Sequence, residues 1–544
     1  MALLAAEPAH ARTTDAAAAR AVLGLNVRLI RRGTLLMALG LAFFAAVEAL
    51  SYVATYPDPA SRSTLAQFQD SPAVRMMQGF PHAADTVGGF VAWDAGWFMQ
   101  SIAAIWALLV TGRLLRGEEE SERAEFILTG PVGAGRVLLA QTLVIGSALL
   151  LIGATVTVTL IATGAQPAGS VVFGLGLAGF GGAFAGVAAV LSQLFAIRRR
   201  TTALTAVALG GAYLVRGVAN SDDALGGLRW LTPYGWMDEL HAFRDPNWTA
   251  LALLILAPLV LTAAAARLRR LRDTGGSLLA ERDSRPPRDR LLGGPTAFAW
   301  RNTRGMLFGW ATGIGLYSLV MGLLVEAVMS FIADDPSYRK ALEAIGWDVG
   351  QVVSSFIGMM GMLVGMLISL YACWRIGAAR AEESSGRLDA VLTRPVSRSH
   401  WLGGHLALAV AGGVFITVAA GLLMWAGTLL SDSGVPLWDV LGAALNSLPV
   451  TVFFTGLAVL VYALVPRAAV ALPAALVFTA FLVETIGPGL DWPEWVLGVS
   501  PFHHLAIFPS EPFAAVPAAV LTVLGLGLAG VGLFAFERRD LAGD

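Results

Sequence analysis

Two acidic segments, residues 113–136 and 375–400, carry dense groups of charged side chains and share one pattern. In each segment a glutamate pair is followed by an arginine, a further acidic residue and a proline, and all matching positions are separated by the same distance along the chain. The pattern consists of Glu118, Glu119, Glu122, Arg123, Glu125 and Pro131 in the first segment, and of Glu382, Glu383, Arg387, Asp389 and Pro395 in the second. We interpret the two segments as a duplicated contact surface on one side of a membrane.

The spacing in the first segment predicts a charged face on a short helix. Its carboxylates recur at helical spacing, and a proline stops a helix because it has no backbone N–H to donate. Such a face fits a basic groove on a partner protein. The alternative is a solvated loop with a helix cap, and the exact recurrence of the pattern in the second segment disfavours it.

Isolated charges within the apolar runs are the second group of candidate residues. Burying a charge in a membrane is costly, and such residues often serve a function. Asp94, Arg216 and Glu484 are the three that we select. Arg216 and Glu484 occupy equivalent places in the two repeats, and we hypothesise that they pair as a gate. The alternative is that both lie near the outer interface and extend their charged ends to water.

Sequence motifs for catalysis, metal binding and nucleotide binding are weak or missing. A phosphate-binding loop needs a lysine directly after a glycine, and the one lysine of the chain, Lys340, does not follow one. The stretches 174–179 and 525–530 match a dinucleotide fingerprint, but they lie inside apolar runs, which favours close helix packing. His503 and His504 are adjacent and lack the spacing of a zinc motif. We therefore predict no catalytic residue, no metal and no cofactor bound by this chain.

The elements that must position these residues are membrane-spanning helices. Of 544 residues, 56% are hydrophobic and 14% are charged, whereas a soluble domain has about 25% charged residues. Apolar runs of about 20 residues are long enough to cross a bilayer. The runs predict an all-α polytopic membrane protein with about twelve spans, near 34–56, 91–112, 137–163, 170–196, 202–219, 249–266, 307–331, 351–374, 402–430, 438–464, 468–487 and 514–536.

The spans divide into two tandem six-helix repeats. The predicted domains are a cytoplasmic tail with an interfacial amphipathic helix at 1–33, a first membrane domain at 34–266, a cytoplasmic linker at 267–297 and a second membrane domain at 298–544. Most of the 37 arginines and lysines fall on one side of the predicted spans. By the positive-inside rule, both acidic segments and both termini lie in the cytoplasm.

A cytoplasmic Glu-Glu-x-x-x-Arg-x-(Glu/Asp) turn that ends in Pro-Val, between the second and third spans, resembles the membrane domain of type-2 ABC exporters. The resemblance covers nearly the whole chain and is closest to the fused two-half branch of actinobacterial exporters of polyketide antibiotics. It implies that the acidic segments are coupling helices on which two copies of a separate ATPase subunit dock, and that ATP and Mg bind to that ATPase. At 133–136 the first segment has Gly-Ala-Gly-Arg where Ser-Arg is usual, which leaves the equivalence of the two docking sites open.

The resemblance also implies that spans two, five, eight and eleven line the substrate pathway. The candidate pathway residues are Asp94, Phe98, Met99, Arg216, Met359, Met362, Met366 and Glu484. Because methionine adapts to irregular apolar ligands, span eight fits amphipathic cargo such as an antibiotic, a drug or a lipid. The expected function is ATP-driven export by alternating access across the plasma membrane, among membrane lipids and without nucleic acid. The alternatives are a secondary drug transporter that uses an ion gradient through intramembrane carboxylates, and a membrane assembly or lipid-handling factor.

Overall fold

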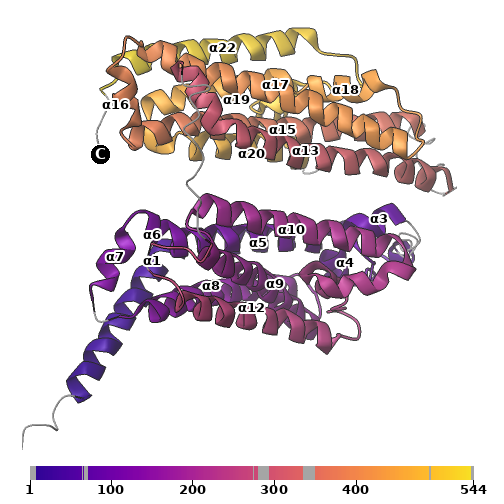
Figure 1. Cartoon of the computed structure of the whole chain (residues 1–544). Helices are drawn as coiled ribbons and strands as arrows, with labels where there is room; N and C mark the ends of the chain where they lie inside the picture. The colour runs from indigo at the N-terminus through magenta and orange to yellow at the C-terminus, as the bar shows by residue number, and fades with distance from the viewer. Residues whose placement is uncertain are drawn as a thin grey trace, which may run out of the picture. The chain divides into compact units, whose positions relative to one another are not determined.

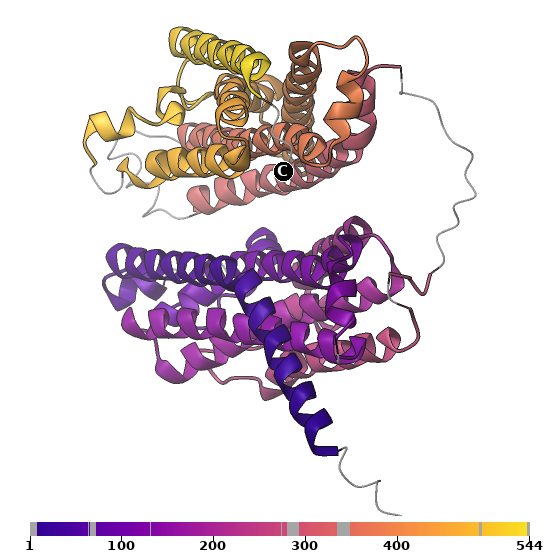
Figure 2. The ribbon, with the colours of Figure 1, turned by 90° about the vertical axis from the view of Figure 1, so that its left-hand side faces the viewer.

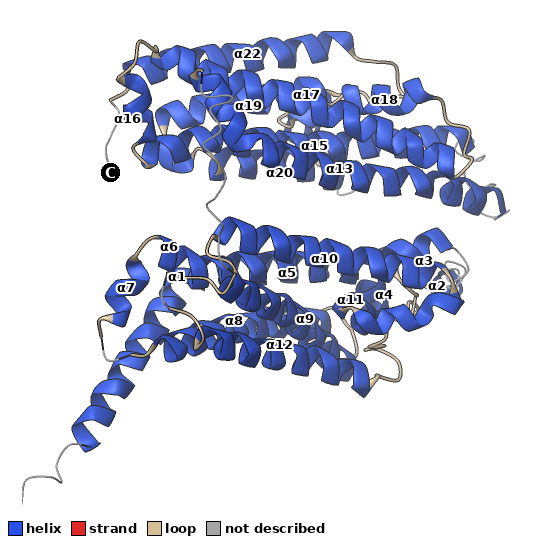
Figure 3. Ribbon diagram, viewed as in Figure 1, coloured by secondary structure: helices blue, strands red, loops and turns tan. Residues whose placement is uncertain are grey.

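The computed structural model describes residues 8–63, 65, 72–130, 132–273, 275–279, 293–334, 349–488 and 492–540. Helices and the loops that join them make up these residues, and no strand occurs among them (Figure 3). The chain divides into two compact units, Met1–Arg285 and Pro286–Asp544 (Figure 1). The division falls inside the segment expected to be a linker, and each unit is described by itself.

The first unit is built from long helices joined by shorter ones. The long helices are α1 (Pro8–Thr55), α5 (Gly96–Gly112), α8 (Ala134–Ala162), α9 (Pro167–Leu194), α10 (Arg198–Ser221) and α12 (Trp248–Arg269). The shorter elements are α2 (Pro59–Ser63), α3 (Pro72–Gln78), α4 (Val87–Asp94), η2 (Arg113–Gly117), α6 (Glu118–Glu120), α7 (Arg123–Leu128), η3 (Asp223–Leu231) and α11 (Pro233–Asp238). The helix α9 packs against α8 and α12, and α1 packs against α8.

The second unit has a corresponding series of helices. The long ones are α13 (Pro295–Asp334), α15 (Val349–Ser384), α17 (Arg398–Leu430), α19 (Leu448–Leu464), α20 (Ala471–Ile486) and α22 (Ala515–Arg538). The shorter elements are α16 (Arg387–Leu392), α18 (Leu437–Leu445), η4 (Pro466–Ala468), α21 (Glu494–Leu497) and η6 (Pro501–His504). The helix α13 packs against α17, and α19 packs against α22.

The prediction of an all-α polytopic membrane protein is confirmed. Among the described residues, 11 helical segments are long and apolar enough to cross a membrane, and α18 and α19 form one of them together. The span expected at 468–487 corresponds to α20, which has only 16 residues. A helix of that length is shorter than the roughly 20 residues that a bilayer requires, so α20 alone does not meet the length expected of a span.

Close approach of helix backbones explains the two stretches that match the dinucleotide fingerprint. A Cβ atom on Gly174 in α9 would lie 2.6 Å from the carbonyl oxygen of Gly153 in α8. A Cβ atom on Gly525 in α22 would lie 2.7 Å from the backbone of Phe453 in α19. Backbones this close leave no room for a side chain, which is the small-residue packing typical of membrane helices. The interpretation as helix-packing residues is confirmed for Gly174, Gly176 and Gly179 and for Gly525, whereas Gly527 and Gly530 have no neighbour within 4 Å of an added Cβ atom.

The amino-terminal helix differs from the expectation. The helix α1 runs without interruption over 48 residues, so the interfacial helix expected within 1–33 is continuous with the first span. Alanine, leucine and arginine dominate this region and favour helix, and the isolated glycines at 24 and 33 do not stop it. In Figure 2 the amino-terminal part of α1 extends beyond the other helices of its unit.

Candidate functional site

The first acidic segment is not one continuous helix. The helix α5 continues through the π-helical turn η2 into α6, and the chain then turns at Glu122 before α7 begins. Glu122 has a φ of 59°, in the left-handed region that breaks a helix of L-residues. The break separates Glu118 and Glu119 from Glu125. The prediction that these carboxylates share one helical face is therefore wrong.

The second acidic segment contains the same break. Glu382 and Glu383 lie near the end of α15, and Gly386, with a φ of 70°, separates them from α16. Gly386 is the residue of the second repeat that matches Glu122, so the left-handed residue occupies the same position in both repeats. This conformation costs roughly 1–2 kcal/mol in a residue other than glycine. Each repeat therefore carries a short helix, α7 or α16, behind a fixed turn.

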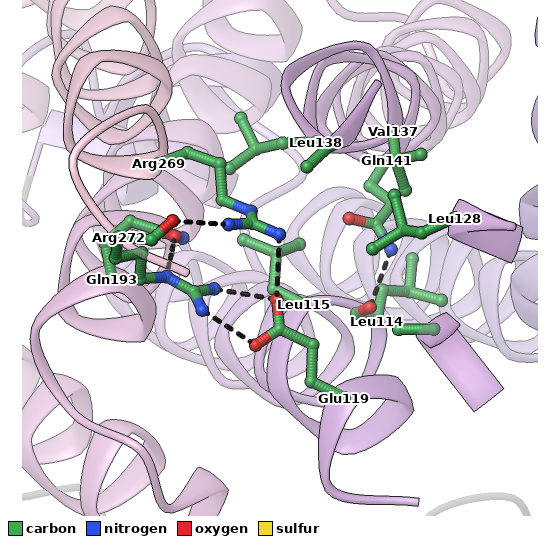
Figure 4. A pocket seen from close by; sticks show the side chains of 12 residues that line it. Leu114, Leu115, Glu119, Leu128, Val137, Leu138, Gln141, Gln193, Arg269 and Arg272 are labelled. Atoms are coloured by element: carbon green, nitrogen blue, oxygen red, sulfur yellow. Dashed lines mark hydrogen bonds and ion pairs between the residues drawn. The ribbon is translucent and has the colours of Figure 1, made fainter. Parts of the chain in front are cut away.

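Glu119 lies inside the first unit. Its carboxylate binds Arg272 at 2.7 Å and Arg116 at 2.8 Å, and Arg269 approaches it to 3.9 Å. Figure 4 shows Arg269 and Arg272 directed toward this carboxylate. Only 10% of the Glu119 side chain is exposed. Because Arg272 follows α12, the carboxylate connects the first acidic segment to the end of the sixth long helix.

Glu383 is bound in a corresponding way in the second unit. Arg539, which follows α22, binds its carboxylate, the Tyr462 hydroxyl donates to it at 2.7 Å, and Arg380 approaches it to 3.6 Å. Only 5% of the Glu383 side chain is exposed. Arg380 precedes Glu383 by one turn of helix, as Arg116 precedes its own glutamate. The second glutamate of each pair is thus an internal anchor.

The first glutamate of each pair has different partners in the two units. Glu118 binds Arg123, the first residue of α7, at 3.0 Å. Glu382 accepts a hydrogen bond from Nε1 of Trp401 at 3.3 Å and lies 3.5 Å from Nε2 of His405. Trp401 and His405 belong to α17, so Glu382 is bound to a membrane helix. The expectation that the glutamate pairs form the contact surface is wrong, because both members of each pair bind inside their own unit. A role of these glutamates in coupling to an ATPase stays a prediction.

The surface that each segment exposes is the short helix after the break. On α7, Arg123 and Glu125 are exposed, and Phe126 is 79% exposed. On α16, Arg387 and Asp389 are exposed. Arginine and aromatic side chains are enriched where proteins bind one another. The sequence analysis missed Phe126, although a phenylalanine within a strongly charged segment was an available signal.

The inner sides of the two short helices are apolar. Ala124 and Leu128 of α7 line a cavity of about 30 Å³ beside the buried carboxylate of this segment (Figure 4). The matching inner residue of α16, Leu388, is 1% exposed. Apolar packing thereby holds each short helix on its own unit and leaves its charged side outward. Pro395 lies in the bend after α16, whereas Pro131 lies outside the described residues.

Arg216 has its partners within the first unit. Its guanidinium binds Asp238 at 2.7 Å and donates to the carbonyl oxygens of Met77 and Gln78 at 2.8 and 2.6 Å. Asn220 donates to the same carboxylate at 2.8 Å. Only 2% of the Arg216 side chain is exposed, so the alternative that it extends to water is wrong. Asp238, which the sequence analysis missed, compensates the charge.

Glu484 also has a partner in its own unit. Its carboxylate lies 3.0 Å from Nδ1 of His503, and the other ring nitrogen of His503 lies 3.7 Å from Glu494. Neither Glu484 nor Arg216 therefore needs the other for charge compensation. The hypothesis that Arg216 and Glu484 pair as a gate stays a prediction, but charge compensation no longer supports it.

The other pathway candidates of the first unit lie in different surroundings. Asp94, at the end of α4, is partly buried and accepts a hydrogen bond from Gln78 at 3.0 Å. Phe98 is 40% exposed and its ring lies 5.1 Å from that of Phe44, whereas Met99 is fully buried. Phe98 and Met99 are consecutive on α5 and point to opposite environments, so at most one of them faces a pathway.

The three candidate methionines of span eight are likewise divided. Met359 is 47% exposed, Met366 is 7% exposed, and Met362 packs partly buried against the core of the second unit. Buried and exposed methionines on one helix match the ordinary pattern of a helix with an inner and an outer side. A pathway role for these residues stays a prediction.

A histidine pair adjoins Arg216 and Asp238. The rings of His82 and His241 lie 3.9 Å apart, in a cavity of about 40 Å³ that the same ion pair lines. Burial, with a smaller contribution from His241, lowers the pKa of His82 to about 4, so its ring is neutral at neutral pH. Among the described residues, no group of three or more histidine, cysteine, aspartate or glutamate side chains is placed to hold a metal ion.

Comparison with known proteins places the chain in a family. The family model described as the multidrug efflux system permease Rv1217c, C-terminal domain, matches residues 20–270 and 292–537. The multidrug efflux system permease protein Rv1217c of Mycobacterium tuberculosis (strain ATCC 25618 / H37Rv) is 34% identical over 529 residues, which cover 95% of each chain. The chain belongs to this permease family.

The residues that the Rv1217c family model matches include both acidic segments but not every partner of their glutamates. Both segments lie within the matched residues, whereas Arg272 and Arg539 each lie just beyond the end of a matched region. Of the arginines that bind the glutamates, Arg116, Arg123 and Arg380 lie within the matched residues, and only Arg272 and Arg539 lie beyond them.

Proposed function

We propose that the chain is the membrane-embedded permease of an ATP-driven multidrug exporter of the ABC type, and that a separate ATPase docks on α7 and α16. The observation that carries the proposal is the repeated short helix behind a left-handed turn, with an apolar inner side and a charged outer side. The similarity to a permease whose name describes multidrug efflux supports drug export.

A separate motor is part of the proposal because the sequence contains one lysine, Lys340, outside any phosphate-binding loop. Two docking helices in one chain fit two copies of the ATPase, which bind the ATP and Mg. The distribution of arginine and lysine supports a plasma-membrane orientation with α7, α16 and both termini in the cytoplasm.

In the proposed cycle, ATP-dependent closure of the two ATPase subunits displaces α7 and α16. This displacement exposes the pathway alternately to the cytoplasm and to the outside. The 56% hydrophobic composition of the chain fits amphipathic cargo, such as an antibiotic, a drug or a lipid, that reaches the pathway from the membrane.

Co-purification of the chain with a candidate ATPase tests the proposal. The variant Glu125→Arg/Asp389→Arg reverses one exposed charge on each short helix at matching positions and leaves the buried anchors intact. Glu537→Arg, an exposed charge reversal at the end of α22, is the control. We expect the wild type and the control to retain the ATPase and to show vanadate-sensitive, drug-stimulated hydrolysis, and the double variant to retain at least tenfold less ATPase. Equal retention by all three, or none by the wild type, contradicts the proposal.

A further inference from the structure

The arginine that follows the sixth long helix reaches the acidic segment in both units. In the first unit, Nη1 and Nη2 of Arg272 bind the two oxygens of Glu119 at 3.0 and 2.7 Å, a bidentate pair (Figure 4). In the second unit, Nη2 of Arg539 binds Glu383. A bidentate or buried charge pair fixes direction as well as distance between the elements that it joins. Each acidic segment is thereby bound to the end of α12 or α22.

The same two arginines also bind the end of the fourth membrane helix. Nε of Arg272 donates to the Gln193 side chain, in the last turn of α9, at 2.8 Å. Nη1 of Arg539 donates to the carbonyl oxygen of Tyr462, in the last turn of α19, at 2.8 Å. Three elements therefore meet at each buried glutamate: the acidic segment, the end of the fourth helix and the end of the sixth.

The two contact groups share a glutamate–arginine pair and differ in the residue that the fourth helix contributes. The glutamates occupy matching positions of the repeated pattern, whereas Arg272 lies beyond the end of α12 and Arg539 lies directly at the end of α22. The fourth helix contributes an amide side chain in one unit and a tyrosine in the other. The same three-element junction thus occurs in both units around the same type of ion pair, although the fourth helix supplies a different side chain, which points to the junction itself as the required feature.

We propose that Arg272 and Arg539 are positioning residues of the transport cycle, which transmit displacement of α7 and α16 to the ends of the fourth and sixth membrane helices. The inference rests on the proposed function, since an ATPase must supply the displacement. Without these arginines, each acidic segment loses its ion pair with the end of the sixth helix, α12 or α22. With them, a shift of the buried carboxylate moves three membrane helices together.

The first junction also includes the beginning of the linker between the units. Nη2 of Arg116 and Nη1 of Arg272 donate to the carbonyl oxygen of Gly276 at 2.8 and 3.2 Å. The backbone N–H of Leu278 donates to the carbonyl oxygen of Gln193 at 3.2 Å. Displacement of Glu119 therefore acts on residues that lead toward the second unit, and we expect the Arg272 contact to have the larger effect on transport.

Neutralising the two arginines tests the inference. The variants are Arg272→Gln and Arg539→Gln, and the matched controls are Arg270→Gln and Arg538→Gln, exposed arginines one or two positions away. We expect the ATPase to co-purify with every variant, while drug efflux falls at least tenfold in Arg272→Gln and Arg539→Gln and stays within twofold in the controls. The charge exchange Glu383→Arg/Arg539→Glu is expected to restore part of the efflux. Retained efflux in the two test variants overturns the inference, as does loss of efflux together with loss of the ATPase.

If a variant fails to fold, a measurement on the wild type tests the positioning role of Arg272 and Arg539. Hydrogen exchange is compared between the nucleotide-free and the vanadate-trapped complex with the ATPase. We expect altered protection at the ends of α9, α12, α19 and α22 as well as in the acidic segments. Change confined to the acidic segments overturns the inference. A wild type that recruits no ATPase refutes the proposed function itself. This outcome distinguishes failure of the proposed function from failure of the inference about the two arginines.

Discussion

The first glutamate of the pair has different partners in the two acidic segments, since Glu118 binds the start of α7 and Glu382 binds α17. The outer residue also differs, because Phe126 is 79% exposed in the first segment and alanine occupies the matching position, 390, in the second. Glu119, by contrast, has a counterpart that binds equivalent elements in the other unit. The two segments are therefore alike at the second glutamate of each pair and different at the first glutamate and on their outer sides. Under the proposed function, transmission and docking would belong to separate residues, and the two docking surfaces would not be equivalent.

Loss of a buried carboxylate is expected to destabilise the protein most. Glu119→Gln leaves Arg116, Arg269 and Arg272 close together without a compensating charge, and removal of one partner from a buried ion pair costs about 3–5 kcal/mol. Glu383→Gln is expected to cost less, because Tyr462 still donates to the amide oxygen. Thermal unfolding of both variants in detergent measures the difference. A larger loss for Glu383→Gln contradicts this order.

The pairs at the matching positions in α10 and α20 extend the comparison. Arg216→Met leaves the carboxylate of Asp238 buried and is expected to destabilise the protein by about 3 kcal/mol. Glu484→Gln is expected to cost less than about 1 kcal/mol, because Glu484 and His503 are partly exposed and the amide still hydrogen-bonds the ring. Unfolding midpoints of the two variants, measured side by side, check the contrast. Similar losses show that the two positions are equivalent after all.

The exposed aromatic ring distinguishes the docking surfaces. An aromatic anchor at the centre of an interface contributes about 2 kcal/mol, so Phe126→Ala is expected to weaken ATPase binding by roughly thirtyfold. Ala390→Ser, at the matching position of α16, is expected to change binding less than twofold. Surface plasmon resonance with immobilised ATPase measures both affinities, and Ala390→Phe is the variant expected to strengthen binding. Equal effects at the two positions imply equivalent docking.

Substitutions at the left-handed residues are expected to have the weakest effects. Glu122→Gly removes a side chain from a φ of 59° and is expected to stabilise the fold by about 0.5–1 kcal/mol. Gly386→Ala places a side chain at a φ of 70° and is expected to destabilise it by about 1 kcal/mol. Unfolding midpoints of the two variants should move in opposite directions. A shift of the same sign in both indicates that the turns differ.

The fold could be predicted from composition and repetition. Apolar runs determine where membrane helices form, and 11 of the expected spans are present as long helices, while α20 is shorter. The position of the acidic segments between the second and third spans followed from the same repeat. The break within each segment was harder to predict, because only Gly386 marked it, and a glutamate such as Glu122 ordinarily favours helix.

The partners of the glutamates could not be predicted. Arg272 and Arg539 lie 153 and 156 residues along the chain from the carboxylates that they bind, and this similar spacing becomes meaningful only once the fold brings the pairs together. Charged residues in segments predicted to be cytoplasmic were interpreted as exposed, although the end of a helix bundle buries them once arginines from other helices meet there. Asp238 was missed for the same reason, since its pairing with Arg216 depends on how α10 and α11 pack.

Drug uptake into inside-out membrane vesicles is the decisive measurement for ATP-driven export. The vesicles contain the chain and its candidate ATPase, and uptake is measured with ATP, with ATP and vanadate, and with ATP and a protonophore. We predict uptake that requires ATP, stops with vanadate and continues with the protonophore. Uptake that collapses with the protonophore while ATP stays constant contradicts ATP-driven export, and indicates Asp94 and Glu484 as carriers of an ion-driven mechanism.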